Sequence, residues 1–302
     1  MPHSFLRPEK FREPTPPTLR RRALAALLPL ALGWSALAAQ AQELTDLAKI
    51  KASGVLKVAV YKDNAPFSDG SGNDMQGLDI AIAQALAKKL QLTLTLLPFD
   101  AGENMGDDLR NMVWKGHYLG YGPADVMMHV PVDKYLMQQN RQVLIFSPYM
   151  RQSQVLLHDA NVIPKVGSAE DLKGVRLAAE RGTGNASVLM GHNAGMLRSQ
   201  VALYDTGMDA AKAVIDGKAA GAFVMRSQAE AVLSKNPSPS ANWTLSPLAL
   251  AGIPQSGWSL GMAIKADSKD LAQALQQAMQ ELRSSGELAA IFKKHGLTLT
   301  AP

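Results

Sequence analysis

The sequence contains no cysteine. Disulfide bonds, thiolate metal sites and a cysteine nucleophile are therefore excluded. The sequence also has no H-E-x-x-H zinc motif and no phosphate-binding P-loop. Aromatic residues make up only 6% of the chain, against 47% apolar residues overall. These absences favour a binding protein with an ordinary apolar core over an enzyme.

A basic excess is missing from most of the chain, although the formal net charge is +5. Residues 1–41 hold six of the 31 Lys and Arg residues and two of the 26 Asp and Glu residues. The remainder therefore has 25 basic and 24 acidic residues. A nucleic-acid partner requires a basic face for its phosphate backbone. No nucleic-acid partner is expected here.

Long apolar runs are scarce, and the clearest one lies near the N-terminus. Arg20-Arg21-Arg22 precedes the mainly apolar residues 23–38, and Ala39-Gln40-Ala41 follows with the small residues of a cleavage site. This layout is typical of a secretory signal, so residues 1–41 are expected to be removed on export to a Gram-negative periplasm. An uncleaved anchor and twin-arginine export are the alternatives. No stable membrane insertion is expected after cleavage.

Short strands alternate with helices after the N-terminal segment, which is typical of an α/β fold built on mainly parallel sheets. A first strand is expected at Val55–Val60, followed by a helix whose N-cap is Asp79. A second strand at Leu92–Leu97 is expected to end at Pro98. Further strands are expected at 125–128, 143–146, 154–157, 175–179, 201–204, 219–225 and 259–264, and further helices at 107–115, 185–191, 209–215 and from 268 onward.

Five motifs follow one another along the chain: Pro66-Phe67-Ser68, Gly77-Leu78-Asp79-Ile80, Phe146-Ser147-Pro148-Tyr149, Asp171-Leu172-Lys173-Gly174 and Arg181-Gly182-Thr183. In this order they resemble the family 3 extracellular solute-binding proteins over residues 53–296. The resemblance implies a two-lobed periplasmic binding protein-like fold with two crossover segments at the hinge. Residues 42–151 and 255–302 would form one lobe and residues 152–254 the other. The ligand would lie in the cleft between them.

One candidate site is the turn from Arg181 to Asn185, because glycines there allow a close backbone approach at a helix N-terminus. Such a terminus offers free N–H groups to an anion, although Thr183 could instead cap its own helix. The resemblance implies that Phe67 forms an aromatic wall of the ligand site; an ordinary core position is the alternative. The expected ligand-binding residues are Asn64, Phe67, His129, Arg141, Tyr149, Arg151, Thr183, Gly184, Asn185 and Met225.

Two positions depart from the pattern of the family's amino-acid binders. Those proteins place an acidic residue near a strand that here reads Gly221 to Met225, and this stretch contains no acid. A ligand ammonium would lose its charge partner there, which is costly in a desolvated site. The arginine that binds the ligand carboxylate in those proteins has an ambiguous counterpart here: Arg141 lies five residues before Phe146, while the loop at that depth reads Val130-Pro131-Val132-Asp133. A small polar or anionic solute is therefore expected, rather than a free α-amino acid.

The segment between residues 112 and 125 is about six residues longer than the family pattern and carries His117, two tyrosines and three glycines. It suits an extended ligand or a protein surface. His117, His129 and Asp133 could form a metal site, but they match no metal motif, and surface histidines are the favoured interpretation. No metal and no cofactor are expected.

The motifs and their departures from the family pattern leave three possible functions. The first is a periplasmic solute-binding protein that delivers a small molecule to the membrane subunits of an ABC importer. The alternative is an accessory or maturation partner of a periplasmic quinoprotein, PQQ-dependent alcohol dehydrogenase, to whose periplasmic-binding-like accessory proteins the chain is loosely similar. The third is a dehydratase-like enzyme in which His129 and Asp133 act as acid and base.

Overall fold

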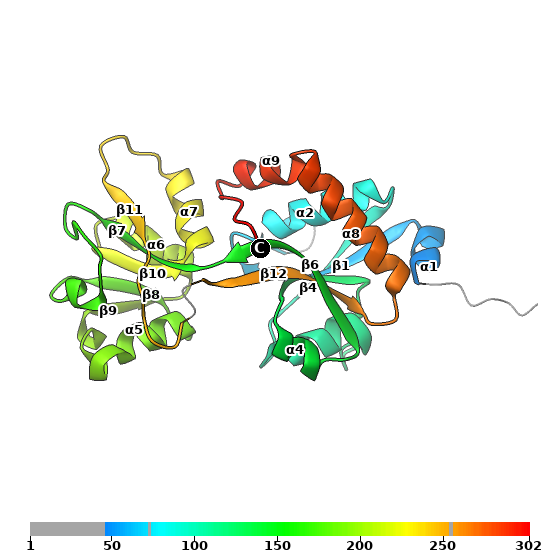
Figure 1. Ribbon diagram of the computed structural model, residues 1–302, viewed down its shortest axis with the longest axis horizontal. Coiled ribbons are helices and arrows are strands. Elements are labelled where there is room, and N and C mark those ends of the chain that lie inside the picture. The colour runs from blue at the N-terminus through cyan, green and yellow to red at the C-terminus, as the bar shows by residue number, and fades with distance from the viewer. Residues whose placement is uncertain (1–45, 72–73, 254–255) are drawn as a thin grey trace, which may run out of the picture. The chain divides into compact units, whose positions relative to one another are not determined.

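The computed structural model describes residues 46–302, except 72–73 and 254–255 (Figure 1). These residues belong to one compact unit, Glu43–Pro302. The expected signal peptide, residues 1–41, lies outside the described residues. Among the helices that are described, none is long and apolar enough to cross a membrane.

The first sheet has five strands in the order β4-β1-β5-β12-β6. Its parallel part consists of β1 (Val55–Tyr61), β4 (Thr93–Phe99) and β5 (Val126–Pro131). Two further strands, β12 (Trp258–Lys265) and β6 (Val143–Gln152), extend it with antiparallel pairing. Because β1, β4 and β5 run in the same direction, their carboxyl ends meet at one edge, called the carboxyl edge below.

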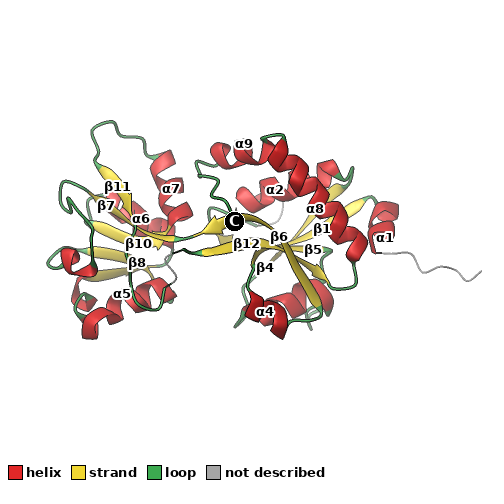
Figure 2. Ribbon diagram, viewed as in Figure 1, coloured by secondary structure: helices red, strands yellow, loops and turns green. Residues whose placement is uncertain are grey.

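Helices cover both faces of the first sheet (Figure 2). One face packs in a core cluster with α1, α2, α8 and α9, and the other with α3, the π-helix η2 and α4. Their bounds are Asp46–Ser53 (α1), Leu78–Lys89 (α2), Lys269–Ser284 (α8), Glu287–Lys294 (α9), Met105–Leu109 (α3), Arg110–Trp114 (η2) and Lys134–Gln139 (α4). Alternate residues of β1 enter the two clusters, as the two-residue period of a strand requires.

The second sheet has the order β11-β7-β10-β8-β9. Parallel pairing joins β8 (Leu177–Glu180) to β9 (Val201–Tyr204) and β10 (Gly221–Met225), while β7 (Gln154–Asp159) and β11 (Trp243–Ser246) are antiparallel additions. The helices α6 and α7 pack on one face and α5 on the other. Further bounds are Gly184–Gly195 (α5), Gly207–Ile215 (α6), Arg226–Lys235 (α7), Asp63–Asn64 (β2), Ser68–Asp69 (β3), Ala169–Leu172 (η3) and Arg198–Gln200 (η4).

The expected strands and helices all form, with shifted ends, and two local expectations were wrong. Pro98 does not end its strand: it lies inside β4, which it can do because β4 is an edge strand and pairs only with β1. Asp79 is not the N-cap of α2, since Gly77 takes that position. The Asp79 side chain is buried and is used by the network described below. The helices α1, α4 and α7 and the strand β11 were not expected.

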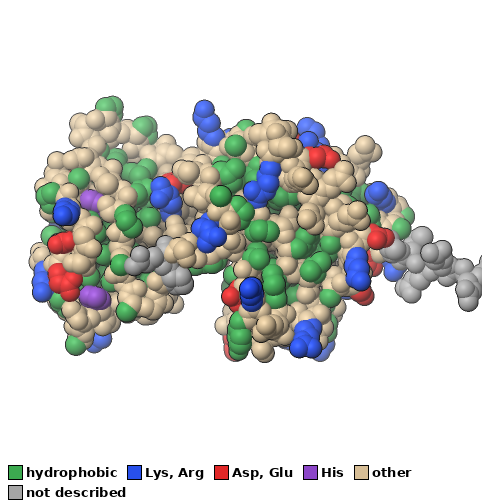
Figure 3. Space-filling view, in the orientation of Figure 1, with side chains coloured by type: hydrophobic (Ala, Val, Ile, Leu, Met, Phe, Trp, Pro, Cys, Tyr) green, Lys and Arg blue, Asp and Glu red, His purple; other side chains and the backbone are tan. Residues whose placement is uncertain are grey.

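Charged side chains do not gather into one basic face on the side of the molecule shown in Figure 3. Lys and Arg side chains are scattered there among acidic, polar and apolar ones. This distribution agrees with the near balance of basic and acidic residues after position 41. It gives a nucleic-acid backbone no continuous basic track on that side.

Candidate functional site

Polar side chains follow the three parallel strands at the carboxyl edge. They surround a cavity of about 390 Å³, called the edge cavity. Its lining residues are Tyr61, Lys62, Asp63, Asn64, Phe99, Asp100, Ala101 and His129. Open α/β sheets bind their ligands beyond the carboxyl ends of the strands. The edge cavity is therefore the first candidate site.

His129 enters the edge cavity through a bulge in β5. Its φ is +63°, a value that residues other than glycine rarely adopt. Between Met127 and Val130, β5 has one residue more than the matching stretch of β12. Alternation along the strand breaks at the same point, because Met128 and Val130 pack in different core clusters. Bulges often redirect a side chain beside a functional site.

A buried hydrogen-bond network fixes the His129 ring. Oδ2 of Asp79 lies 2.9 Å from His129 Nδ1, and the Tyr149 hydroxyl donates to Oδ1 of Asp79 at 2.7 Å. The same hydroxyl accepts the His129 backbone N–H at 3.2 Å. Because an ionised carboxylate only accepts hydrogen bonds, Nδ1 carries the proton in this contact. In a neutral ring, Nε2 is then the acceptor nitrogen.

Burial keeps Tyr149 in its donor form. The hydroxyl's pKa is raised well above its usual value by loss of solvent and then by the neighbouring Asp79 carboxylate. Tyr149 is fully buried, and Asp79 is only 1% exposed. A buried carboxylate needs such donors, because an unpaired one is costly. Tyr149 was expected to contact the ligand. It instead supports His129, through the Asp79 carboxylate and the His129 backbone N–H.

Phe67 packs beside the same network. Its ring centroid lies 4.4 Å from that of His129, and its carbonyl accepts the Asp79 backbone N–H at 2.8 Å. Phe67 is buried, which is the core position that the sequence left open as an alternative. Its backbone N–H donates to the Asn64 carbonyl at 2.8 Å, which closes the turn after β1. Asn64 lines the edge cavity, whereas Phe67 contacts the His129 ring and is not part of the lining.

A second polar pair lies at the wall formed by β1. The Tyr61 hydroxyl donates to Oδ2 of Asp108 at 2.8 Å, and Oδ1 accepts the Gly102 backbone N–H at 2.7 Å. Burial raises the pKa of Asp108, and burial followed by the Asp108 charge raises the pKa of Tyr61. Asp108 is buried, so its carboxylate depends on these two donors.

The α5 turn in the second sheet uses its side chains locally. The Thr183 hydroxyl accepts the Ala186 N–H at 3.3 Å and donates to the Glu180 carbonyl at 2.8 Å. Thr183 is therefore the N-cap of α5, as the alternative interpretation held. Gly184 is the first residue of the helix, and Asn185 is buried in its first turn. The backbone at this turn is still the start of a helix, which runs to Gly191 before the chain kinks at residues 192–194.

Glu180 is a further candidate site residue, and it was not expected from the sequence. It ends β8, and one of its carboxylate oxygens accepts the Gln228 amide at 3.2 Å. The other end of that amide accepts the Met225 backbone N–H at 3.1 Å. Met225 is the N-cap of α7, so its expected place at a strand end is right. Residues 221–225 contain no acidic residue, but the Glu180 carboxylate lies near Met225 on the neighbouring strand β8. The sequence did carry a signal for it, because Glu180 directly precedes the Arg181–Thr183 turn.

The two expected arginines lie at different edges of the first sheet. Arg151 lies within β6, near the end that pairs with the start of β12, and its guanidinium donates to the Ser256 carbonyl at 3.2 Å. Arg141 precedes the other end of β6 and is exposed. Because β12 is antiparallel to both β5 and β6, those two strands run in the same direction. Arg141 precedes the start of β6, so it lies at the edge of the sheet opposite the carboxyl edge. The structure therefore separates Arg141 from the rest of the expected site.

The expected partner of His129 was wrong. Asp133 does not pair with it but caps α4, where its Oδ1 accepts the Leu136 N–H at 2.8 Å. His117 stacks on Tyr121 with ring centroids 4.2 Å apart, on a loop where Tyr118 is 87% exposed. Across the residues that the structure describes, no group of three or more histidines and acids could hold a metal ion.

Residues Gly257–Gly261 match the G-x-S-x-G spacing of a hydrolase nucleophile elbow, but the context is different. That elbow places its serine on a sharp turn from a strand into a helix. Here Ser259 lies inside β12 and opposite Arg151 of β6. The match is therefore coincidental.

Neither a known family model nor a curated protein matches the sequence. Solved structures do match. An ancestral cationic amino acid solute-binding protein is 21% identical with a TM-score of 0.62, over 82% of this chain and 98% of that one. A polar amino acid ABC uptake transporter substrate-binding protein from Streptococcus thermophilus is 20% identical with a TM-score of 0.61, over 84% and 90%.

A third structure is an ancestral amino acid-binding protein described as a precursor of cyclohexadienyl dehydratase. It is 21% identical with a TM-score of 0.54, over 83% of this chain and 99% of that one. Identities this low establish architecture and leave function to the site itself. The chain therefore has the two-lobed α/β fold of these substrate-binding proteins, as the order of its sequence motifs predicted.

Proposed function

We propose that the chain is an exported solute-binding protein that captures a small polar solute and delivers it to an ABC importer. The observation that carries this proposal is the edge cavity, where a bulge and the Asp79 carboxylate orient His129 at the carboxyl ends of three parallel strands. An oriented imidazole in a polar cavity is a ready recognition group. The fold is also shared with amino acid binding proteins.

The proposed lobes are residues 42–151 with 255–302, and residues 152–254. In the ligand-bound state the solute contacts the edge cavity of the first lobe and the α5 turn of the second. Ligand then shifts an open–closed equilibrium, because both lobes bind it only in the closed state. The importer's membrane subunits recognise that closed state.

The charges favour a solute that carries both a donor and an anionic group. In the edge cavity Asp63 and Asp100 accompany one lysine, Lys62, which pairs with Asp100 at 2.7 Å. The N-terminus of α5 favours an anionic group. Glu180 adds a carboxylate near Met225 that the sequence pattern had not supplied. A zwitterionic solute is therefore again a candidate beside a purely anionic one.

A thermal-shift screen tests the proposal. The panel contains amino acids, organic acids, polyols and cofactors, because a bound solute stabilises the folded state by mass action. One chemical class is expected to raise Tm in a concentration-dependent way. His129→Ala is expected to abolish that shift, and His117→Ala, on the exposed loop, is the matched control. A shift that survives His129→Ala, or no shift with any solute, contradicts the proposal.

Export is tested separately in a Gram-negative host. Intact-mass measurement of protein from the periplasmic fraction is expected to give a chain that begins at Gln42. An uncleaved product in the membrane fraction contradicts it.

A second candidate function is the accessory protein of a periplasmic quinoprotein dehydrogenase. The observation that favours it is the loop around Tyr118, Leu119 and Tyr121, whose large apolar side chains are exposed. Isolated apolar side chains on a surface are ordinary, but a cluster of them suits a protein partner. Co-purification of a dehydrogenase that is lost in Tyr118→Ser with Leu119→Ser would support this function. Unchanged dehydrogenase activity after deletion of the protein would contradict it.

The dehydratase-like alternative changes its catalytic pair. The base would be His129 oriented by Asp79, in place of the expected pair with Asp133. The similarity to an ancestral precursor of a dehydratase motivates the assay. Absence of turnover with a cyclohexadienyl substrate rules this alternative out, and turnover that persists in His129→Ala rules out His129 as its base.

A further inference from the structure

The helix α7 packs against both sheets. Ala229 lies in a core cluster of the second sheet, whereas Ala231, which is 1% exposed, lies in a cluster of the first. The side chains that meet the first lobe share one face of the helix, at the spacing i, i+3, i+4 and i+7. This face is called the inner face below, and its residues are Ser227, Glu230, Ala231 and Ser234.

The N-terminal end of the inner face is fixed at the crossover between the proposed lobes. The Ser227 hydroxyl donates to the Gln152 side-chain oxygen at 3.2 Å, and both residues are buried. The Arg226 backbone N–H donates to the Ser153 carbonyl at 2.9 Å. Gln152 ends β6, and Ser153 separates it from β7. The helix is therefore attached where the chain passes from one lobe to the other.

The rest of the inner face meets the C-terminal segment of the first lobe, residues 296–302. The Thr298 N–H donates to the Glu230 carboxylate at 2.8 Å, and the Glu230 side chain is only 11% exposed. Gly296 rests on Ser234, because a Cβ at Gly296 would overlap the Ser234 hydroxyl. Ser234 lies two helical turns beyond the crossover contact, about 10 Å along the helix axis. A rotation at the crossover therefore moves this end of α7 most.

The first lobe holds the C-terminal segment in place. The Thr300 hydroxyl donates to the Arg151 carbonyl at 2.7 Å, and the Arg151 N–H donates to the Thr300 carbonyl at 3.3 Å. Leu297 and Leu299 pack in the same cluster as Ala231. Figure 1 shows this segment passing from α9 to β6 beside α7. It is therefore a fixed surface against which α7 rests.

The bond between Glu230 and Thr298 has no equivalent elsewhere between the lobes. Among the residues that the structure describes, it is the one hydrogen bond made by a side chain that joins residues 152–254 to the rest of the protein. The contact is small and partly polar, and interfaces of that kind permit motion between domains. A rotation of the lobes must therefore break or displace this contact.

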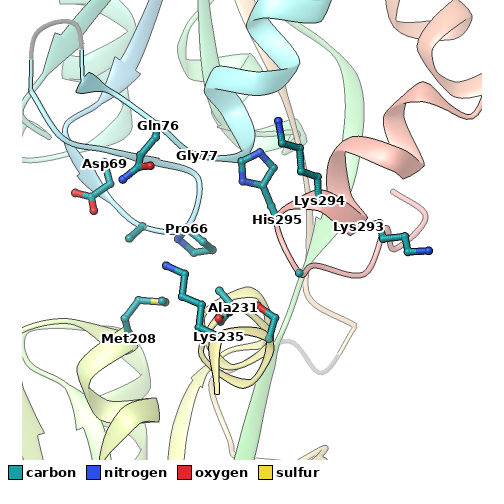
Figure 4. A pocket seen from close by; sticks show the side chains of 13 residues that line it. Pro66, Asp69, Gln76, Gly77, Met208, Ala231, Lys235, Lys293, Lys294 and His295 are labelled. Carbon is teal, nitrogen blue, oxygen red and sulfur yellow. Dashed lines mark hydrogen bonds between the residues drawn. The ribbon is translucent and has the colours of Figure 1, made fainter. Parts of the chain in front are cut away.

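The lobes also have room to approach each other. A cavity of about 460 Å³ separates Ala231 from the loop that carries Pro66 and Gly77. Figure 4 shows this loop opposite α7 across the cavity. The edge cavity is lined by first-lobe residues alone, so the α5 turn does not close on it in this structure. The contact at the inner face therefore belongs to the open arrangement.

We propose that the inner face of α7 and residues 296–302 form a contact that holds the lobes open and breaks when they close around the solute. The inference rests on the proposed function, which supplies the two lobes and their open–closed equilibrium. A protein that is held open binds its solute more weakly, in proportion to the fraction of closed molecules. The contact therefore regulates the solute site without touching the solute.

Double electron–electron resonance tests this proposal in the absence of any solute. The chain has no cysteine, so spin labels react only at introduced ones. Glu103→Cys follows β4 and Asp205→Cys follows β9, and both positions are exposed at the carboxyl ends of their strands. Glu230→Ala is expected to raise the population of a second, shorter distance at least about threefold, because a hydrogen bond to a charged carboxylate is lost.

Arg226→Ala is the matched control for Glu230→Ala. Arg226 pairs with the same carboxylate at 2.8 Å, but within α7, so its removal leaves the bond to Thr298 in place. The distances of this control should match those of the wild type. An unchanged distribution in Glu230→Ala overturns the proposal, and so does an equal change in Arg226→Ala.

A second pair of variants tests the contact at Gly296. Gly296→Ala forces a Cβ against Ser234 and is expected to populate the shorter distance as well. Adding Ser234→Gly removes the overlap and should restore the wild-type distribution. Failure to restore it would assign the change to the backbone strain of an alanine at a φ of +70°, and would overturn a role for the contact.

The two proposals fail in different experiments. No solute is present in the distance measurement, so a negative thermal-shift screen leaves its result intact. A solute response that depends on His129, together with unchanged distances in Glu230→Ala, would keep the proposed function and reject the contact as its regulator.

Discussion

The Tyr149 hydroxyl donates a 2.7 Å hydrogen bond to the Asp79 carboxylate across 70 positions of sequence. One residue comes from β6 and the other from the first turn of α2, and both are buried. The bond ties a helix to an outer strand of the first sheet. It also completes the shell that orients His129, so stability and ligand recognition depend on the same contact.

Tyr149→Phe tests this contact by removing only the hydroxyl. The buried carboxylate loses a donor, which is expected to lower the free energy of unfolding by about 1.5–3 kcal/mol. Urea denaturation measures the change. Tyr135→Phe is the matched control, because Tyr135 is 70% exposed and should change stability by less than about 0.5 kcal/mol. Equal stability of the two variants would contradict a structural role for the bond.

Asp79→Asn tests how the His129 ring is oriented. In the wild type the carboxylate accepts from Nδ1, so the neutral ring is expected to carry its proton there. An amide can donate as well as accept, so this preference for one tautomer is lost in the variant. Nitrogen NMR shifts of the imidazole report the tautomer directly. The signals of His117, on the exposed loop, should stay in place. An unchanged His129 spectrum would show that Asp79 does not select the tautomer.

Most of the fold was predictable because it depends on local patterns. Strand and helix periodicity located the elements, and their order matched a two-lobed architecture. The strand was expected to end at Pro98, because the sequence does not indicate that β4 lies at an edge of the sheet. At an edge, the missing N–H of proline costs little. Likewise α4 was missed because its six residues contain none that is buried, so they show no apolar stripe.

The site was less predictable, because its contacts are long-range. His129 was found, but its partner Asp79 lies 50 positions away, and the nearer Asp133 was chosen instead. The bulge that turns His129 arises only when β5 pairs with β12. Glu180 and Met225 illustrate the same limit, since they meet through Gln228 only after β8 and β10 align. Spacing along the chain cannot reveal such pairings.

Gly77→Ala tests how closely the loop after β1 approaches α2. A Cβ at Gly77 would lie 2.2 Å from the Phe67 carbonyl oxygen, and the residue's φ of +132° also disfavours any side chain. The variant is expected to lose more than about 3 kcal/mol of stability, because backbone strain and a steric clash act together.

Gly182→Ala is the control for that change. Gly182 has a φ of +76°, but no atom lies within 4 Å of the position that a Cβ would take there, so only the backbone cost of about 1–2 kcal/mol applies. Chemical denaturation compares the two variants. A loss at Gly77 no larger than that at Gly182 would mean that the loop moves away freely from α2.

The protein is expected to lose stability in mild acid because of His158. It is buried in β7, with Nε2 2.9 Å from the Ser246 hydroxyl of β11, and burial lowers its pKa below the usual value of 6.5. A histidine whose folded pKa is depressed contributes its full stability above pH 6.5. That contribution declines as pH falls below 6.5, because the unfolded chain then binds the proton more readily.

His158→Gln removes the titrating group while an amide can keep the contact with Ser246. The unfolding free energy of the wild type is expected to fall more steeply between pH 7.5 and about pH 5.5 than that of the variant. His295 also has a lowered pKa and adds a slope of the same sign in both proteins, so the comparison isolates His158. His117→Gln should keep the wild-type slope. Identical slopes for wild type and His158→Gln would mean that His158 stays accessible to protons in the folded state, and that the pairing of β7 with β11 does not exclude solvent from its ring.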